Sequence, residues 1–274
     1  MKTLKYGLIV SDFDGTLVKK DGTIAREVKN AIFAYQEKGG KFALSTGRLP
    51  MGILPHARSL GLTGVACCCN GAVIVDIPSG EVLFEGKIPY KTAVSVCKKL
   101  EKLGAHIHVY DVWEYYCNRD DEALRLYENA TGTKAKLVTG EPLSVFLERE
   151  KLDVCKILVM TEPENADALM AELERERFAG CHVTKSAAFL VEVLNEKYSK
   201  GTAIDFLSKY YGVLSENTIG VGDQRNDIPM IERAGLGVAV QNADENAKAV
   251  ADVVLTRTNE EGAVAELINE YAYE

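Results

Sequence analysis

The stretch Asp12-Phe13-Asp14-Gly15-Thr16 places two carboxylates where an apolar run over residues 6–10 ends. That run is long enough for a buried strand, and Gly15 lets the backbone turn away from it. Asp12 and Asp14 are one pleat repeat apart, so both side chains point the same way in an extended backbone. Ligands bind at the carboxyl ends of strands in α/β sheets, but Asp and Gly also form plain turns. The stretch therefore predicts either a ligand site or a turn.

The composition is that of a soluble globular protein with an acidic balance. The chain has 274 residues, 47% of them hydrophobic and 26% charged, with a formal net charge of −8. This charge argues against general binding to nucleic acid or anionic membranes. No apolar run approaches the ~18 residues that span a bilayer, and residues 1–5 lack the apolar region of a signal peptide, so we expect a cytoplasmic protein. The seven cysteines include no C-x-x-C pair, and we expect Cys67 to Cys69 to be core residues.

Apolar runs and helical spacings alternate at both ends of the chain. In the first part, the predicted strands are 6–10, 41–44, 65–69 and a hairpin of 72–76 with 82–84, and the predicted helices are 25–38 and 50–60. In the last part, the predicted strands are 218–221, 236–240 and 253–255, and the first predicted helix runs from Lys200 to Tyr211. This alternation predicts an α/β fold with a Rossmann-like parallel sheet and right-handed crossovers, formed by residues 1–85 and 195–274.

The middle of the chain has a different pattern. Its predicted helices are 91–103, 121–130 and 164–177, and its predicted strands are 106–110, 114–117, 154–160, 181–185 and 189–194, with a loop around Pro142. We interpret residues 86–194 as a second, α+β domain inserted into the first. A small hairpin is also expected at residues 17–24, with Asp21-Gly22 at its tip, which would form a flap beside the two aspartates.

A second acidic loop, Gly222-Asp223-Gln224-Arg225-Asn226-Asp227, follows another apolar strand. Either aspartate could simply form a turn or cap a helix. Two such loops in one sheet would gather four carboxylates at one edge, which is costly without a cation. A few hard oxygen ligands suit Mg²⁺ better than zinc. The same edge would receive Ser45, Thr46 and Lys200, and hydroxyls with an ammonium are suited to bind phosphate.

Other motifs do not fit. The chain has no G-x-x-x-x-G-K-[ST] sequence, residues 12–14 do not continue as a calcium loop, and Gly235-Leu236-Gly237 lacks the rest of a dinucleotide fingerprint. The four histidines, His56, His106, His108 and His182, are scattered along the sequence, and we expect them in core or surface roles.

Four motifs in order resemble those of the haloacid dehalogenase (HAD) superfamily of phosphatases, specifically the Cof-like group with an inserted C2B-type cap. They are Asp12-Phe13-Asp14-Gly15-Thr16, Ser45-Thr46-Gly47-Arg48, Lys200-Gly201, and Gly222-Asp223 with Asn226-Asp227. The resemblance covers the whole chain, with the insert between the second and third motifs. It implies a HAD core with residues 86–194 as the cap that selects the substrate.

The resemblance also implies a role for each motif residue. Asp12 would be the nucleophile that forms an aspartyl-phosphate, and Asp14 the general acid and then base. The metal site would be Mg²⁺ held by Asp12, the Asp14 carbonyl, Asp223 and Asp227. The phosphate-binding residues would be Ser45, Thr46, Gly47, Lys200 and Asn226. Lys197 is a rival for the lysine role, although Lys200 fits the motif spacing better.

The resemblance implies a Mg²⁺-dependent phosphomonoesterase for a small phosphorylated metabolite, such as a sugar phosphate, pyridoxal phosphate or flavin mononucleotide. One alternative is a sugar phosphomutase, which Lys134, Lys136 and Lys156 of the cap would support. Another is a phosphometabolite-binding protein without turnover. Trp113 or Tyr115 could stack on a substrate ring, or pack in the core. No obligate protein partner is evident.

Overall fold

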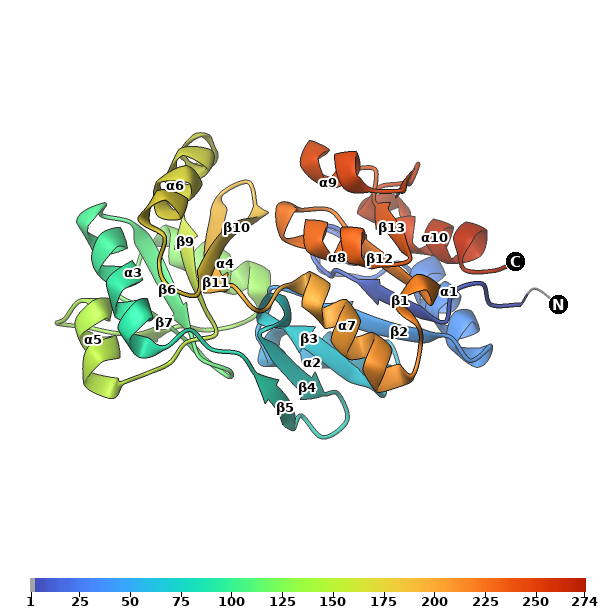
Figure 1. Cartoon of the computed structure of the whole chain (residues 1–274), viewed down its shortest axis with the longest axis horizontal. Coiled ribbons are helices and arrows are strands. Elements are labelled where there is room, and N and C mark those ends of the chain that lie inside the picture. Colours follow the sequence, from blue (N-terminus) through green and yellow to red (C-terminus); the bar gives the residue numbers. More distant parts are fainter. Residues whose placement is uncertain (1–2) are drawn as a thin grey trace.

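The computed structural model describes residues 3–274 and contains two β-sheets that lie side by side along the long axis of the molecule (Figure 1). We call the body built on the eight-stranded sheet the core, and the body built on the six-stranded sheet the cap. The core strands come from both ends of the chain and the cap strands from its middle. The predicted α/β architecture is therefore confirmed, whereas the domain boundaries at 85/86 and 194/195 stay predictions.

The core sheet has the strand order β14-β13-β12-β1-β2-β3-β4-β5. Its strands are β1 (Leu8–Ser11), β2 (Lys41–Ser45), β3 (Val65–Cys68), β4 (Val73–Asp76), β5 (Val82–Glu85), β12 (Thr218–Gly222), β13 (Leu236–Ala239) and β14 (Val253–Val254). The strands from β14 to β3 are parallel, and β4 and β5 add an antiparallel hairpin at the edge. The strands predicted for this part of the chain are confirmed, with small shifts at their ends.

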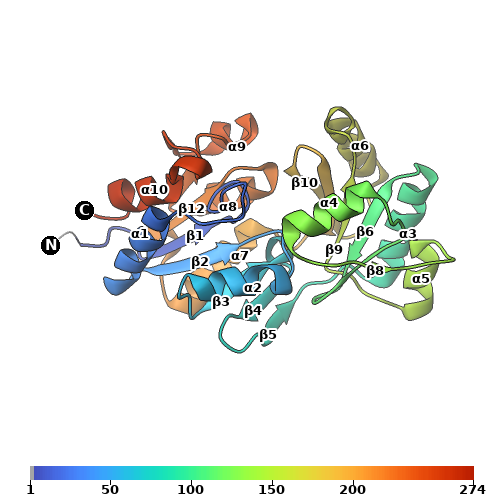
Figure 2. The ribbon, with the colours of Figure 1, turned by 180° about the vertical axis from the view of Figure 1, so that it is seen from behind.

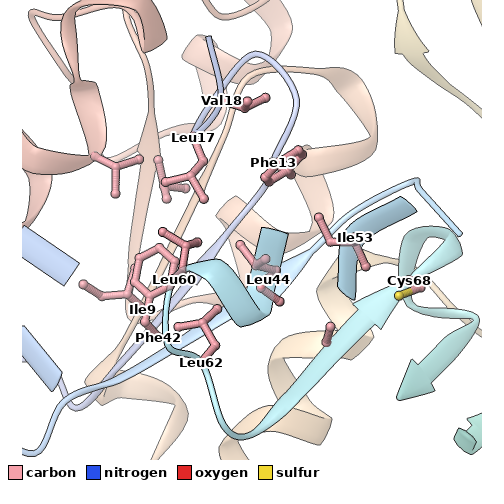
Figure 3. Packing of buried hydrophobic residues seen from close by; sticks show 14 of the residues in the cluster. Ile9, Phe13, Leu17, Val18, Phe42, Leu44, Ile53, Leu60, Leu62 and Cys68 are labelled. Atoms are coloured by element: carbon pink, nitrogen blue, oxygen red, sulfur yellow. The ribbon is translucent and has the colours of Figure 1, made fainter. Parts of the chain in front are cut away.

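Helices cover both faces of the core sheet because neighbouring residues of each strand point to opposite faces. The helices of the core are α1 (Arg26–Glu37), α2 (Pro50–Ser59), α7 (Lys200–Tyr211), α8 (Ile228–Arg233), α9 (Glu245–Val250) and α10 (Ala263–Tyr271). Ile9 and Phe42 pack in one cluster with α1, α2 and α10, part of which Figure 3 shows. Leu8 and Val10 pack in another cluster with α7 and α8.

The cap sheet has the strand order β10-β11-β9-β6-β7-β8. Its strands are β6 (His106–Tyr110), β7 (Tyr115–Cys117), β8 (Lys136–Leu137), β9 (Lys156–Met160), β10 (Cys181–Ala187) and β11 (Leu190–Asn195), and its helices are α3 (Tyr90–Lys102), α4 (Glu122–Thr131), α5 (Leu143–Glu150) and α6 (Pro163–Glu176). The odd-numbered residues of β6, β9 and β11 pack against α3, α5 and α6. Their even-numbered residues therefore point to the opposite face of the sheet, where some of them pack with α4 and the core. Figure 2 shows α4 lying over this face.

Two local predictions are wrong. The segment after Pro142 contains helix α5, because Pro142 occupies the N-cap and its fixed φ suits a helix start. Residues 17–24 contain no strand; they form a loop closed by the Lys19 N–H donating to the Thr23 carbonyl and the Gly22 N–H donating to the Lys19 carbonyl. The Asp21 carboxylate accepts from Thr23 within this loop, so local side-chain bonds replace a strand ladder.

Candidate active site

Three neighbouring parallel strands bring polar side chains to one edge of the core sheet. In the order β2-β1-β12, strand β2 ends at Ser45, while Asp12 and Asp223 directly follow β1 and β12. Parallel neighbours end at the same edge, so these residues meet. Lys200 arrives from another direction, as the first residue of α7, which Ser199 caps.

Lys200 lies at the centre of a buried carboxylate cluster. Its ammonium donates to Asp12 Oδ1 at 2.5 Å and to Asp227 Oδ1 at 2.6 Å. Carboxylate oxygens of Asp12, Asp223 and Asp227 lie within 4.8 Å of one another, and all four side chains are buried. Lys197 is exposed, so Lys200 is the lysine that contacts the acidic residues.

Hydrogen bonds hold the carboxylates of Asp223 and Asp227 in place. Thr16 Oγ1 donates to Asp223 Oδ1 at 2.9 Å. Asp227 Oδ2 accepts the backbone N–H groups of Asp223 and Gln224, each at 2.9 Å. Gly15 has a φ of +79°, and a Cβ there would lie 2.4 Å from Asp223 Oδ2. Only glycine allows this backbone conformation and this close approach of the two loops.

The cluster carries a surplus of negative charge, because three carboxylates face one ammonium. Burial raises the pKa of Asp12 well above its ordinary value, although the charge of Lys200 opposes this. Burial and the charge of Asp227 raise the pKa of Asp223 to about 7. Burial would lower the pKa of Lys200, but Asp12 and Asp227 outweigh it and raise that pKa. The arrangement is therefore one that an additional cation would stabilise.

The donor set fits a hard divalent cation. The three side chains offer only carboxylate oxygens, which are the ligands that Mg²⁺ prefers, and a charge of two would offset the surplus on the cluster. Zinc sites instead favour nitrogen and sulfur.

Asp14 lies outside the carboxylate cluster. Its side chain is 52% exposed and accepts from Arg48 Nε and a terminal guanidinium nitrogen, each at 2.7 Å. The same guanidinium also donates to the carbonyls of Ala130 and Thr131 at the end of α4. Arg48 thus connects Asp14 of the core to the cap. We did not predict this role. The sequence signal for it was the position of Arg48 after Gly47 in the second motif, which places a polar residue at the sheet edge.

The predicted phosphate-binding residues differ in how many of their polar atoms are already hydrogen-bonded within the protein. Ser45 Oγ and Asn226 Oδ1 are buried and have no hydrogen-bond partner within residues 3–274. Buried polar atoms are normally paired, so both are suited to a ligand. The Thr46 N–H already donates to the Cys67 carbonyl at 2.8 Å, which leaves the Thr46 hydroxyl as the donor it can offer. Gly47 lines the cleft described below.

A buried hydrogen-bond network that we did not predict runs from the cap to Asn226. Lys156 donates to Glu192 at 3.0 Å and to the Gly47 carbonyl at 2.8 Å. Glu192 accepts from Asn70 Nδ2 at 2.5 Å, and Asn70 Oδ1 accepts from Asn226 Nδ2 at 2.8 Å. Lys156 and Glu192 are even-numbered residues of β9 and β11. The alternation of side chains along each strand could therefore have indicated that both lie on the same face of the sheet.

A cleft of about 1130 Å³ lies between the core and the cap. Its lining includes Asp12, Asp14, Asn226, Tyr127 and Phe189. The two aromatic residues singled out from the sequence do not line it: Tyr115 is fully buried, and Trp113 is exposed elsewhere on the cap. The three cap lysines considered for a phosphomutase are all paired with carboxylates, in the pairs Lys134–Glu128, Lys136–Glu114 and Lys156–Glu192.

Comparison with known proteins agrees with this fold and site. The sequence model of the haloacid dehalogenase-like hydrolase family matches residues 9–268. A putative phosphatase of Haemophilus influenzae is 31% identical over 94% of this chain and 96% of its own length. The 5-amino-6-(5-phospho-D-ribitylamino)uracil phosphatase YitU of Bacillus subtilis is 30% identical over 99% of each chain. A haloacid dehalogenase-like hydrolase structure from Bacillus subtilis has a TM-score of 0.85 at 27% identity, covering 97% of this chain and 99% of that one.

The parallel core sheet, the inserted cap and the acidic loops at the sheet edge define a haloacid dehalogenase-like hydrolase, and the chain belongs to that superfamily. Within it, the protein is a Cof-like member and a phosphatase. No helix within residues 3–274 is long and apolar enough to cross a membrane.

Proposed function

We propose that this phosphatase is a Mg²⁺-dependent phosphomonoesterase that hydrolyses small phosphorylated metabolites through an aspartyl-phosphate. The observation that carries the proposal is the contact of Lys200 with Asp12 and Asp227 at a cleft that also exposes Asp14. Asp12 lines this cleft whereas Asp227 is fully buried, so Asp12 would be the nucleophile that accepts the phosphoryl group.

Asp12, Asp223 and Asp227 would hold Mg²⁺, which when bound would supply charge stabilisation for the phosphoryl oxygens. Ser45, the Thr46 hydroxyl, Gly47 and Asn226 would orient the phosphate. Lys200 would hold Asp12 in position and offset negative charge that builds up on the phosphate. The buried, unpartnered Ser45 Oγ and Asn226 Oδ1 support these assignments.

In the first half-reaction, a carboxylate oxygen of Asp12 would attack phosphorus in line, and the ester P–O bond would break. Asp14 would give a proton to the leaving alkoxide. In the second half-reaction, Asp14 would take a proton from water, whose oxygen would attack phosphorus and release inorganic phosphate and Asp12. The exposed position of Asp14 on the cleft suits both transfers.

The cleft supports a small-molecule substrate. Its volume of about 1130 Å³ is slightly above the usual ~300–1,000 Å³ for such sites. Tyr127 and Phe189 offer aromatic surface for the leaving group, and the acidic net charge disfavours nucleic acid. The relative YitU is named for a phosphorylated ribitylamino-uracil, which is a substrate of this size class.

The proposal is tested with purified protein, Mg²⁺ and a panel of phosphorylated metabolites, comparing kcat/KM. We expect Asp12→Asn to abolish turnover while the far-UV circular dichroism stays unchanged. Asp205→Asn is a matched control, because Asp205 pairs with Arg233 on the surface of the core, and it should keep full activity. Turnover by Asp12→Asn, or ligand binding by the wild-type protein with no turnover of any phosphate ester, would contradict the proposal.

A further inference from the structure

A group of two histidine side chains and one cysteine side chain lies in the cap, apart from the carboxylate cluster. His106 and His108 are two residues apart on β6, so both point to the same face of the cap sheet. The β6–β7 register places Cys117 opposite His108. All three are buried, with His106 7% exposed and the other two fully covered. The fold thus brings His106 and His108, two of the four histidines of the chain, next to each other and to Cys117.

The donor atoms of these side chains converge. His106 Nε2 lies 3.1 Å from His108 Nε2 and 3.4 Å from Cys117 Sγ. All three ligand atoms lie within 4.8 Å of one another. Zinc bonds of about 2.0–2.1 Å to nitrogen and about 2.3 Å to sulfur set tetrahedral edges of about 3.3 Å between nitrogens and about 3.5 Å between nitrogen and sulfur. The two short separations are therefore close to those that zinc requires.

Each ligand also has a partner on its outer side. His106 Nδ1 lies 3.4 Å from Asp121 Oδ2, and His108 Nδ1 lies 3.4 Å from the Tyr110 hydroxyl. The Arg119 N–H donates to Cys117 Sγ at 3.4 Å. Such contacts orient metal ligands and leave their inner donor atoms directed at the ion.

We propose that His106, His108 and Cys117 form a zinc site with three protein ligands, in which water would take the fourth position. His106 lines the cleft together with Arg119 and Asp121, which provides the access route, while His108 and Cys117 lie behind it. Imidazole and thiolate ligands select zinc over Mg²⁺, so this site and the carboxylate cluster differ in the metal they take. On binding, the S–H bond of Cys117 breaks, a sulfur–zinc bond forms and the proton passes to solvent.

The test uses the full chain in millimolar MgCl₂, which keeps the carboxylate cluster supplied with its own cation. We expect calorimetric titration with ZnCl₂ to show one equivalent bound, and titration with CoCl₂ to give a near-ultraviolet thiolate-to-cobalt absorption band. Cys117→Ser should abolish the band. Asp121→Asn should weaken zinc binding by about 10–100-fold, and asparagine can still cap α4.

The matched control is Cys97→Ser, because Cys97 is a buried cap cysteine on α3, in the cluster behind the other face of the sheet. It should keep both zinc binding and the cobalt band. The proposal is overturned if the wild-type chain binds no zinc, or if the cobalt band persists in Cys117→Ser. None of these readouts uses turnover, and Asp12→Asn should bind zinc as the wild type does, so the result is separate from that of the proposed phosphatase mechanism.

Discussion

The buried pair Lys156–Glu192 provides the sharpest prediction about stability. Both side chains are at most 2% exposed, and Glu192 accepts from three donors: Lys156 Nζ, Asn70 Nδ2 and Ser186 Oγ. Removing one partner of a buried ion pair costs about 3–5 kcal/mol, because the other charge stays buried. For Lys156→Met we expect the lower end, about 3 kcal/mol, since Asn70 and Ser186 still donate to Glu192.

For Glu192→Gln we expect the upper end, about 4–5 kcal/mol. A carboxylate accepts on both oxygens, but an amide carries one acceptor and one donor. In either amide orientation, the Gln nitrogen would face a donor, and Lys156 would lose its countercharge. The double variant should be less destabilised than the sum of the single variants, with a coupling of about 1–3 kcal/mol.

The assay is urea denaturation followed by the fluorescence of Trp113, the only tryptophan of the chain, which lies in the cap. Lys98→Met is the control, because the Lys98–Glu148 pair lies on the cap surface and is worth less than about 1 kcal/mol. The reasoning is refuted if both single variants lose less than about 1 kcal/mol, or if their effects add within about 0.5 kcal/mol.

Three further results are expected. Treatment with EDTA should remove turnover, and Mg²⁺ alone should restore it; unchanged turnover would exclude a required metal. Asp14→Asn should lower kcat by about 10²–10⁴-fold, and with an aryl phosphate, whose leaving group needs no acid, it should accumulate phosphorylated protein, detectable by mass spectrometry. Burial outweighs the Asn195, Glu192 and Glu196 contacts and lowers the pKa of His182, so the unfolded state binds the proton more readily and stability should fall as pH drops below 6.5. Burial also lowers the pKa of the other three histidines, so His182→Gln should remove only part of that dependence, and an unchanged pH profile would contradict a contribution from His182.

Much of the core could be predicted because its signals are local. Strand alternation, short apolar runs and loops rich in Asp and Gly lie within a few residues of each other in the sequence. Because parallel strands end at one edge, the meeting of Asp12, Ser45 and Asp223 also follows from the order of these elements. Lys200 could be placed there only through its motif, since a single lysine has no periodic signal.

The cap network and the proposed zinc ligands of the cap could not be predicted because they depend on contacts between elements. Lys156 and Glu192 lie on different strands, and Asn70, which donates to Glu192, comes from a turn of the core. His106 and Cys117 meet only through the β6–β7 pairing. Strand alternation indicates which residues share a face, but the pairing register and the packing of the cap on the core decide which of them touch.

The turn that contains Asn70 has a consequence for how this protein can evolve. Cys69, Asn70 and Gly71 all have positive φ angles, of 49°, 57° and 90°. For the first two residues such a conformation costs of order 1–3 kcal/mol each. Replacing Asn70 by glycine would relieve part of that strain but would cut the connection between Glu192 and Asn226. Glycine at position 70 should therefore be rare among folded variants even though it relieves backbone strain, because the two buried hydrogen bonds of the Asn70 side chain are lost with it.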